Sequence, residues 1–257
     1  MGSALANIFK ITELRRKILF TLAMFVIFRL GTHIPVPGVN PAMIERLFNN
    51  GNLFGLLDLF SGGALSKFSV FAMSITPYIN ASIILQLLKV VIPTLDEWSK
   101  EGEEGFKKTN KVTRYCTVGL ALIQALGMAY GLREAIDNFS FFSVLLITIT
   151  LTAGTILLMW IGEEITQFGI GNGISILIFA GIISSIPSVI GQNLSLAQQS
   201  SQMLIPFVIE VLVTIALTII VILIAEGERR VPILYAGRGT KGAAEKSNVP
   251  IKINQAG

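Results

Sequence analysis

The sequence predicts an all-α protein that crosses a membrane several times. Of its 257 residues, 52% are hydrophobic and only 14% are charged, and the mean hydropathy is +0.70. Soluble domains carry roughly 25% charged residues, so this composition indicates an integral membrane protein. Apolar stretches of sufficient length predict six spanning helices, at about 18–34, 68–92, 115–132, 141–161, 174–191 and 203–225.

The positions of lysine and arginine predict the orientation of these helices. With the N-terminus inside, sixteen of the twenty cations fall in inner segments, and only Arg46, Lys67 and Arg133 fall outside. Cytoplasmic loops of membrane proteins hold an excess of such residues, so we expect both ends of the chain in the cytoplasm. Arg29 lies within the first span, near its outer end, and we expect it to direct its charge to the lipid headgroups, although a functional or structural role inside the membrane is the alternative.

The inventory of reactive residues excludes several kinds of site. Cys116 is the single cysteine and His33 the single histidine, so neither an intrachain disulfide nor a His/Cys metal cluster can form. An intramembrane protease is disfavoured because no Asp lies within a predicted span and no Ser is placed to make a dyad with His33. We therefore expect no catalytic residue, metal or cofactor.

The outer loop after the first span, residues 33–52, leads into a short apolar piece at 53–60. Eight helical residues reach only about 12 Å, well short of a bilayer core of about 30 Å. Ser61-Gly62-Gly63 then breaks the chain and permits a sharp turn. Because apolar residues occur on all sides of 53–60, we expect a short helix buried inside the protein, although a helix lying on the membrane surface is the alternative.

The second span carries the first candidate functional residues. Pro77 lies inside the expected helix 68–92 and predicts a kink. Ile75 and Ile79 are one helical turn apart and share a face. Asn80 is a polar residue at membrane depth, and it needs a partner on another helix or a water molecule.

The next segments alternate between polar and apolar. The inner segment 93–114 mixes charges of both signs with glycines, and we expect a solvated loop there. The third span contains Gln124, a second polar residue that needs a partner. The fourth contains Thr148, Thr150, Thr152, Gly154 and Thr155, small and hydroxyl residues to which we assign close helix packing.

The run GIGNG at 169–173 contains a G-x-G, but no β-α-β context surrounds it, so we read it as a tight inner turn and not as a nucleotide site. Ile174 and Ile178 follow at the same one-turn spacing as Ile75 and Ile79. Glu210 lies in the sixth span, where pairing with a neighbour and a functional role both stay open. Residues 226–257 are basic, and their prolines and glycines predict turns or a hairpin.

Four runs of the sequence resemble the SecY family, the pore-forming subunits of the bacterial protein-conducting channel. They are FRLGTHIPVPG, LFSGGALSKFSVFAMSITPYINASIILQLL, GEEITQFGIGNGISILIFAG and ERRVPILYA, and they follow the family's order over nearly the whole chain. That family has ten spanning helices in two pseudo-symmetric halves. The resemblance implies the first five-helix half plus the sixth helix of the SecY fold, so we expect a fragment, or one piece of an interrupted chain.

The resemblance also divides the chain. It implies a cytoplasmic N-terminal segment at 1–17, the first half of the channel at 18–192, an outer loop with the sixth helix at 193–225, and a basic cytoplasmic loop at 226–257. Residues 53–66, which we call the closing segment, correspond to the plug that closes the outer vestibule. Its named residues are Leu53, Phe54, Leu57, Phe60, Ser61, Gly62 and Gly63.

Roles for further residues are implied in the same way. Four of the six residues of the ring that constricts the pore correspond to Ile75, Ile79, Ile174 and Ile178. Asn80 and Gln124 correspond to polar residues of the lateral gate. The segment 228–252 corresponds to the loop that meets a cytoplasmic partner, with docking residues Arg229, Arg230, Tyr235, Arg238 and Lys241.

The expected function is the passage of unfolded secretory polypeptides across the bacterial cytoplasmic membrane and the release of membrane-protein segments into it. The implied partners are SecE and SecG, the SecA ATPase or the ribosome, a signal-bearing polypeptide, anionic lipid and the C-terminal half of SecY. The alternative is a secondary transporter or small-solute channel with broken helices, but such proteins typically place charged or carbonyl ligands at the midplane. The residues expected at the midplane of this chain are Ile, Asn and Gln.

Overall fold

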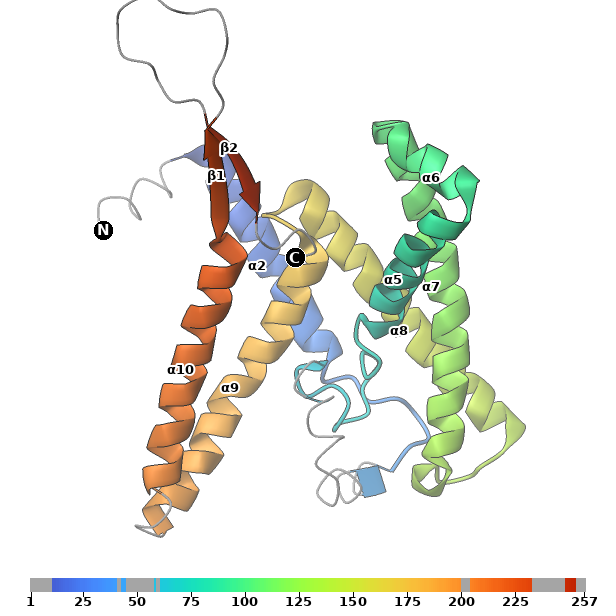
Figure 1. Ribbon diagram of the computed structural model, residues 1–257. Coiled ribbons are helices and arrows are strands. Elements are labelled where there is room, and N and C mark those ends of the chain that lie inside the picture. Colours follow the sequence, from blue (N-terminus) through green and yellow to red (C-terminus); the bar gives the residue numbers. More distant parts are fainter. Residues whose placement is uncertain are drawn as a thin grey trace, which may run out of the picture. The chain divides into compact units, whose positions relative to one another are not determined.

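The computed structural model describes residues 11–40, 43–44, 58, 61–199, 204–232 and 248–252, and its regular structure is almost all helical (Figure 1). The long helices are α2 (Thr12–Gly31), α5 (Thr76–Val91), α7 (Glu103–Gly131), α8 (Phe141–Phe168), α9 (Gly173–Gln199) and α10 (Leu204–Glu226). The short elements are α6 (Pro93–Lys100), η1 (Arg133–Ala135), β1 (Glu228–Pro232) and β2 (Asn248–Lys252). The expected helical membrane fold is confirmed. The chain divides into two compact units, Met1–Pro187 and Ser188–Gly257.

Four of the described helices are long and apolar enough to cross a membrane by themselves. They are α7, α8, the Gly173–Gly191 part of α9 and the Ile205–Glu226 part of α10, which match the last four expected spans. α5 and α6 together would make a fifth, bent by 103°. α2 covers most of the first expected span with 20 residues, or about 30 Å of helix, and its charged residues lie near its two ends.

The expectation of a helix over 68–92 with a kink at Pro77 is wrong in its first part. Residues 61–75 form a series of turns, and α5 begins only at Thr76, with Pro77 in its first turn. Phe68 (φ 43°) and Ser74 (φ 52°) have left-handed backbone conformations that a continuous α-helix excludes. Proline suits a first helical turn because the N–H that it lacks would have no partner there. Pro77 therefore starts the helix and does not bend it.

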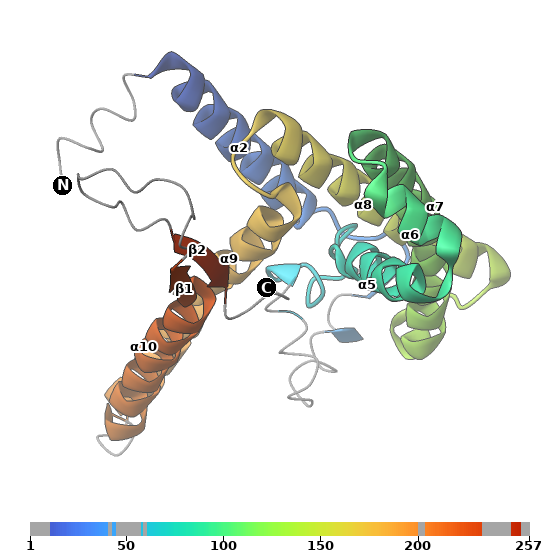
Figure 2. The same ribbon diagram turned by 45° about the horizontal axis from the view of Figure 1, so that its top comes forward.

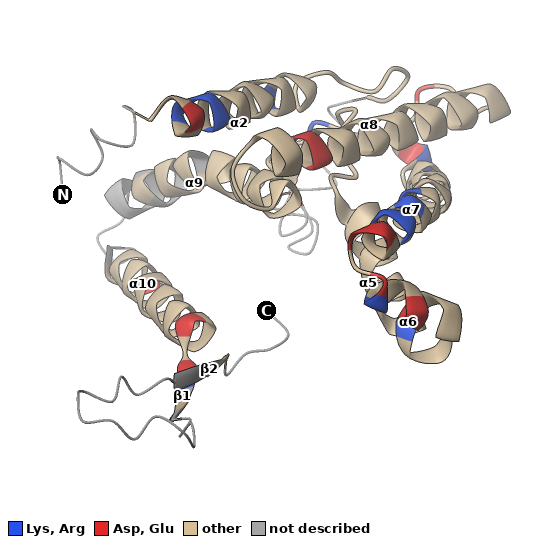
Figure 3. Cartoon of the chain, turned by 90° about the horizontal axis from the view of Figure 1, so that it is seen from above, with Lys and Arg blue, Asp and Glu red and all other residues tan. Residues whose placement is uncertain are grey.

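The segment 93–114, expected to be a solvated loop, is mostly helical. α6 and α7 meet at Gly102, whose φ of 69° is in the left-handed region, and a Cβ on Gly105 would collide with the backbone carbonyl of Trp98. Charged residues gather in α6 and around the start of α7 (Figure 3). They form the ion pairs Lys100–Asp96, Lys107–Glu103 and Lys108–Glu101. The mixed charges that suggested a loop stabilise the surfaces of two helices.

A stripe of small residues lets α7 pack closely against its neighbours. The stripe consists of buried residues that recur every four positions along the helix: Thr113, Thr117, Ala121, Ala125 and Ala129. The three alanines share a core cluster with apolar residues of α8 and of the segment before α5. α7 packs along both α5 and α8 (Figures 1 and 2). Small side chains permit this close approach of helix backbones.

α8 supplies much of the core of the first unit, since 56% of its apolar 18-residue stretch is buried. Gly154 lies against the turns before α5, and a Cβ there would collide with the carbonyl of Val70. The hydroxyls of Thr148 and Thr150 donate to the carbonyls four residues earlier, at 2.7 and 2.8 Å, so they need no partner on another helix. This packing agrees with the structural role assigned to the small and hydroxyl residues of the fourth span.

The second unit contains α10 and a β-hairpin. β1 and β2 are antiparallel, and Arg229 lies opposite Ile251 while Val231 lies opposite Val249. The expectation of a hairpin in 226–257 is therefore confirmed for the described residues. On α10 the described side chains are exposed on nearly every side, and its apolar stretch has no buried residue.

Candidate functional site: an apolar constriction

Three of the four expected ring residues surround one cavity in the first unit. The cavity has a volume of about 310 Å³. Its lining comes from the turns 61–75, from α5, α7 and α9, and consists of Ser61, Leu65, Ala72, Met73, Ser74, Ile75, Thr76, Ile79, Gln124, Met128 and Ile178. No charged residue is among them. Ser61, Ser74, Thr76 and Gln124 contribute polar groups, and the other seven residues are apolar, so the lining is mainly apolar and uncharged.

Three of the four isoleucines belong to an apolar cluster next to the cavity. Ile75 is 2% exposed and packs there with buried residues of α2, α8 and α9. Ile79 and Ile174 pack on the same cluster. Ile174 is absent from the lining, so the structure brings Ile75, Ile79 and Ile178 to the cavity and places Ile174 beside it. The four isoleucines thus lie in one region: Ile75 directly before α5, Ile79 on α5, and the other two on α9.

The beginning of α9 is fixed by the GIGNG turn. Gly171 has a φ of 61°, and a Cβ on Gly173 would collide with the carbonyl of Gly162 on α8. The side-chain Oδ1 of Asn172 accepts hydrogen bonds from the N–H groups of Ile174 (3.1 Å) and Ser175 (3.3 Å). These contacts cap the helix and set the positions of Ile174 and Ile178.

Gln124 and Asn80, the two residues expected at a lateral gate, have different positions. Gln124 is half-buried on α7 and lines the cavity. Asn80 is half-buried on α5 and is not part of that lining. The structure therefore brings only Gln124 to the constriction.

The closing segment is described at Asp58 and from Ser61 onward. Leu53, Phe54, Leu57 and Phe60 lie outside the described residues. The carboxylate Oδ1 of Asp58 accepts hydrogen bonds from Ser61 Oγ (3.0 Å) and from the N–H groups of Leu65 (3.0 Å) and Ser66 (2.9 Å). Asp58, the polar residue in the apolar piece 53–60, thus serves as an anchor of this segment. The Asp-x-x-Ser spacing was the signal for this capped turn.

Arg29 is exposed, and its guanidinium also has partners inside the protein. Its Nη1 donates to the carbonyl of Gly62 at 3.0 Å and to Ser184 Oγ on α9 at 3.4 Å. An arginine inside a span was the available signal, because such a residue usually has a partner in the protein. Its partners lie 33 and 155 residues away in the chain, which the sequence pattern does not reveal.

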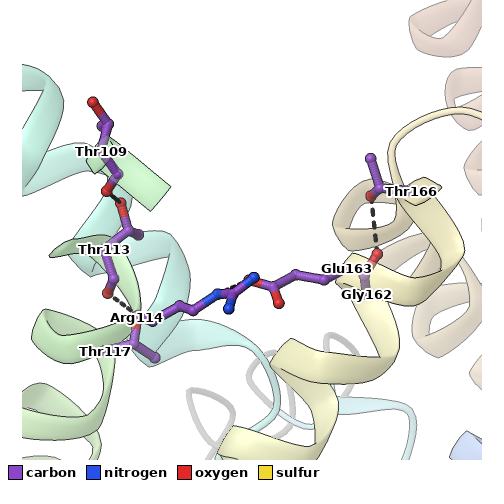
Figure 4. Close-up of polar contacts among 7 residues, drawn as sticks. All are labelled: Thr109, Thr113, Arg114, Thr117, Gly162, Glu163 and Thr166. Atoms are coloured by element: carbon purple, nitrogen blue, oxygen red, sulfur yellow. Dashed lines mark hydrogen bonds and ion pairs between the residues drawn. The ribbon is translucent and has the colours of Figure 1, made fainter. Parts of the chain in front are cut away.

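An ion pair joins the first half of α7 to the last turns of α8. Arg114 Nε contacts Glu163 Oε1 at 2.7 Å, and the carboxylate is the less exposed partner, at 26% (Figure 4). On α7, Thr113 and Thr117 donate to carbonyls four residues earlier, while Thr166 on α8 donates to Gly162. The pair therefore bridges two helices, whereas the hydroxyls of these threonines donate within their own helix (Figure 4). Thr166 Oγ1 also accepts from the N–H of Gly173 at the start of α9, at 2.8 Å.

The docking residues proposed for the basic loop are only partly described. Arg229 is exposed on β1, and Arg230 follows it on the same strand. Tyr235, Arg238 and Lys241 lie outside the described residues. In the part of the chain that the structure describes, no group of three or more His, Cys, Asp or Glu residues could hold a metal ion.

Comparison with known proteins relates this chain to protein-conducting channels. A sequence model of a family described as SecY matches residues 69–257. The chain is 46% identical to the protein translocase subunit SecY of Staphylococcus aureus strain NCTC 8325 and 45% identical to that of Bacillus subtilis strain 168. Both alignments cover 100% of this chain and 63% of the relative, so the chain spans less than two thirds of the length of these relatives.

Solved structures show the same fold. "The structure of a protein conducting channel" matches with a TM-score of 0.65 at 19% identity, covering 93% of this chain and 52% of that one. "The plug domain of the SecY protein stablizes the closed state of the translocation channel and maintains a membrane seal" matches with 0.64 at 19% identity and the same coverage. "Sec61 in the Canine ribosome-channel complex from the endoplasmic reticulum" matches with 0.61 at 19% identity, covering 91% and 53%.

Proposed function

The chain belongs to the SecY family, and from this we propose that it forms the central, pore-forming subunit of a protein translocation channel. Its substrates are unfolded secretory polypeptides, which pass across the membrane, and membrane-protein segments, which leave sideways into the lipid. The observation that carries the proposal is the apolar cavity where Ile75, Ile79 and Ile178 meet Ser61 and Leu65 of the closing segment. The channel performs no chemical step of its own.

The isoleucines suit a seal that must also let a polypeptide through. A narrow apolar constriction expels water, so an ion that enters it loses hydration without gaining a ligand. Isoleucine is stiff at χ1 and offers no hydrogen bond, so the constriction keeps its shape and does not bind the passing backbone. We assign Ile174 to the same ring because it packs on the same apolar cluster as Ile75 and Ile79.

We assign closure of the channel to residues 53–66, and the release of membrane-protein segments into lipid to Asn80 and Gln124. One solved relative is described as a SecY protein whose plug domain stabilises the closed state and maintains a membrane seal. Ser61 and Leu65 of the closing segment line the cavity of the present chain, which supports that role. Gln124 lines the cavity from α7, so a segment leaving sideways would pass this polar group.

Photocrosslinking tests the passage of a polypeptide. A photoreactive residue at position 79, in the native membrane, is expected to crosslink to a secretory protein stalled during translocation. The same residue at position 84 is the control, because Ile84 lies on a different face of α5 and is 43% exposed. Equal crosslinking from both positions, or none from position 79, would contradict the proposed path.

This membrane protein is proposed to lie in the bacterial cytoplasmic membrane with its N-terminus inside, because sixteen of its twenty cations fall in the inner segments. Single cysteines test the orientation in a Cys116→Ser background. An impermeant thiol reagent added outside is expected to label Asn49→Cys and Gln198→Cys but not Asn110→Cys or Lys246→Cys. Labelling of position 246 from outside would reverse the proposed orientation.

The basic hairpin is proposed as the docking site for a cytoplasmic motor ATPase or the ribosome, and SecE, SecG and the C-terminal half of SecY as further subunits. Exposed Arg229 lies on the hairpin with partly exposed Val231 and Ile251, a mixture typical of an interface core. One solved relative is a Sec61 channel in a complex with the ribosome. A loop needed only for orientation would require few cations, whereas this one also carries Arg238, Lys241 and Lys246.

Combined Arg238→Glu and Tyr235→Ala substitutions are expected to weaken binding of SecA or ribosomes at least tenfold while insertion stays normal. Charge reversal removes the attraction to acidic protein or RNA surfaces, and the alanine removes an aromatic contact. The measurement is binding to vesicles that contain the channel. Lys107→Glu with Tyr115→Ala on α7 is a matched control, because both side chains are exposed. Wild-type affinity with selective loss of anionic-lipid binding would assign the loop to the membrane surface.

A further inference from the structure

Arg29 joins three parts of the first unit at the edge of the closing segment. It lies in the last turn of α2, and its Nη1 donates to the Gly62 carbonyl at 3.0 Å and to Ser184 Oγ of α9 at 3.4 Å. Ser184 Oγ in turn donates to the Gly181 carbonyl at 2.8 Å. One guanidinium group thus contacts both the glycine turn of the closing segment and the α9 surface on which that turn lies.

Gly62 is the residue that makes this close seat possible. Its φ is 68°, in the left-handed region, and a Cβ at this position would lie 2.9 Å from Ser184 Oγ and 3.0 Å from the Cα of Gly181. The backbone of the turn therefore rests directly on α9, with no side chain between them. Gly63 also has a left-handed backbone, with a φ of 82°, but open space surrounds it. Contact with α9 thus concentrates at Gly62.

The end of α2 holds the far side of the same turn as well. His33 Nε2 accepts a hydrogen bond from Lys67 Nζ at 3.1 Å, because an ammonium group can only donate, and His33 Nδ1 then donates to the Arg29 carbonyl at 2.9 Å. Beyond them, the N–H of Val36 donates to the carbonyl of Phe68 at 3.0 Å. Residues 62–68 are therefore attached at both ends to α2 and the segment that follows it.

We propose that Arg29 is the positioning residue of closure: its bonds to Gly62 and Ser184 form a latch that keeps the turn at Gly62, within the described residues 61–66 of the closing segment, seated on α9 until a substrate displaces it. This inference rests on the proposed channel function. Gly62 contributes a neutral carbonyl to the latch and Ser184 a neutral hydroxyl. A hydrogen bond from a charged donor to a neutral acceptor contributes less free energy than breaking a buried ion pair costs. Such a latch therefore stabilises the closed position, and opening it leaves no carboxylate buried without a partner.

The latch is tested by the resting ion conductance of vesicles that contain the whole channel. Arg29→Gln is expected to raise it by about tenfold, since charge-assisted hydrogen bonds contribute enough to shift an equilibrium by that factor or more. Ser184→Ala removes one of the two acceptors and is expected to have a smaller effect. Arg29→Lys keeps a cationic donor and is expected to restore most of the closure. Arg133→Gln is the matched control, because Arg133 lies on η1 at the same predicted outer side.

A reversible disulfide bond distinguishes loss of the latch from a general loss of packing as the cause of the leak. Gly62→Cys and Ser184→Cys are introduced together with Cys116→Ser, since the geometry at Gly62 places its Cβ next to the Ser184 side chain. Oxidation is expected to abolish the leak of Arg29→Gln and to block translocation, and reductant is expected to restore both. The single Gly62→Cys variant reports the effect of a side chain at this left-handed position.

The outcomes distinguish the latch from the channel itself. If Ile79→Asn conducts ions while Arg29→Gln and Ser184→Ala both stay closed, the latch is overturned and the channel function stands. If none of these variants conducts and position 79 gives no crosslink to substrate, the proposed function fails. A leak of Arg29→Gln that persists in the oxidised cysteine pair also overturns the latch. Should Arg29→Gln fail to accumulate, Ser184→Ala and Arg29→Lys carry the same test.

Discussion

Replacing Ile79 with asparagine is expected to raise the resting ion conductance of the channel at least tenfold. Ile79 lines the cavity beside Ile75, which is 2% exposed, and no charged group shares the lining. An amide at this position hydrogen-bonds water, so the constriction becomes wet and an ion passes without losing its hydration. Ile178→Asn, on the facing helix α9, is expected to have a similar effect because it wets the same cavity from the other side.

The control for this experiment lies on the same helix. Ile83→Asn makes the same chemical change one turn further along α5, at a side chain that is 49% exposed. It is expected to leave the conductance unchanged. Conductance is measured in vesicles without substrate, together with the amount of folded protein. Unchanged conductance in Ile79→Asn, with lower stability alone, would identify the isoleucines as ordinary packing residues.

Replacing Gly154 with leucine is expected to prevent accumulation of the folded protein. A Cβ at this position would collide with the backbone carbonyl of Val70, and a backbone atom cannot rotate away as a side chain does. Gly154→Ala is expected to lower the free energy of unfolding by about 1–3 kcal/mol, the range typical of an overpacked core. Val70 lies in the turns that lead to Ile75, so the displaced backbone also disturbs the constriction.

Gly127→Ala on α7 is the matched control for Gly154→Ala. No atom outside the helix lies within 4 Å of a Cβ at position 127. The substitution is expected to be neutral or to stabilise the helix by roughly up to 1 kcal/mol, because alanine has the higher helix propensity. Thermal unfolding of the detergent-solubilised protein measures both variants. Equal midpoints for Gly154→Ala and Gly127→Ala would show that α8 adjusts its distance from the turns before α5.

Much of the fold follows from local properties of the sequence. Length and apolarity alone located the last four spanning helices, since a bilayer demands internally bonded backbone over a set distance. The one-turn spacing of Ile75 and Ile79, and of Ile174 and Ile178, predicted two shared faces. The glycines of GIGNG predicted the turn before α9, and the prolines and glycines after position 226 predicted the hairpin. Each of these features depends on residues close together in the chain.

Features that depend on contacts between residues distant in the chain were decided by the tertiary structure alone. Apolar composition did not reveal that residues 61–75 fold into turns with left-handed Phe68 and Ser74, because this segment packs against residues of α7 and α8 that are distant in the chain. Nor did it reveal that Arg29 reaches Gly62 and Ser184, since a long side chain takes the acceptor that folding brings within its reach. Helix periodicity specifies which residues share a face, but only the packing of α5, α7 and α9 determines that these faces enclose one cavity.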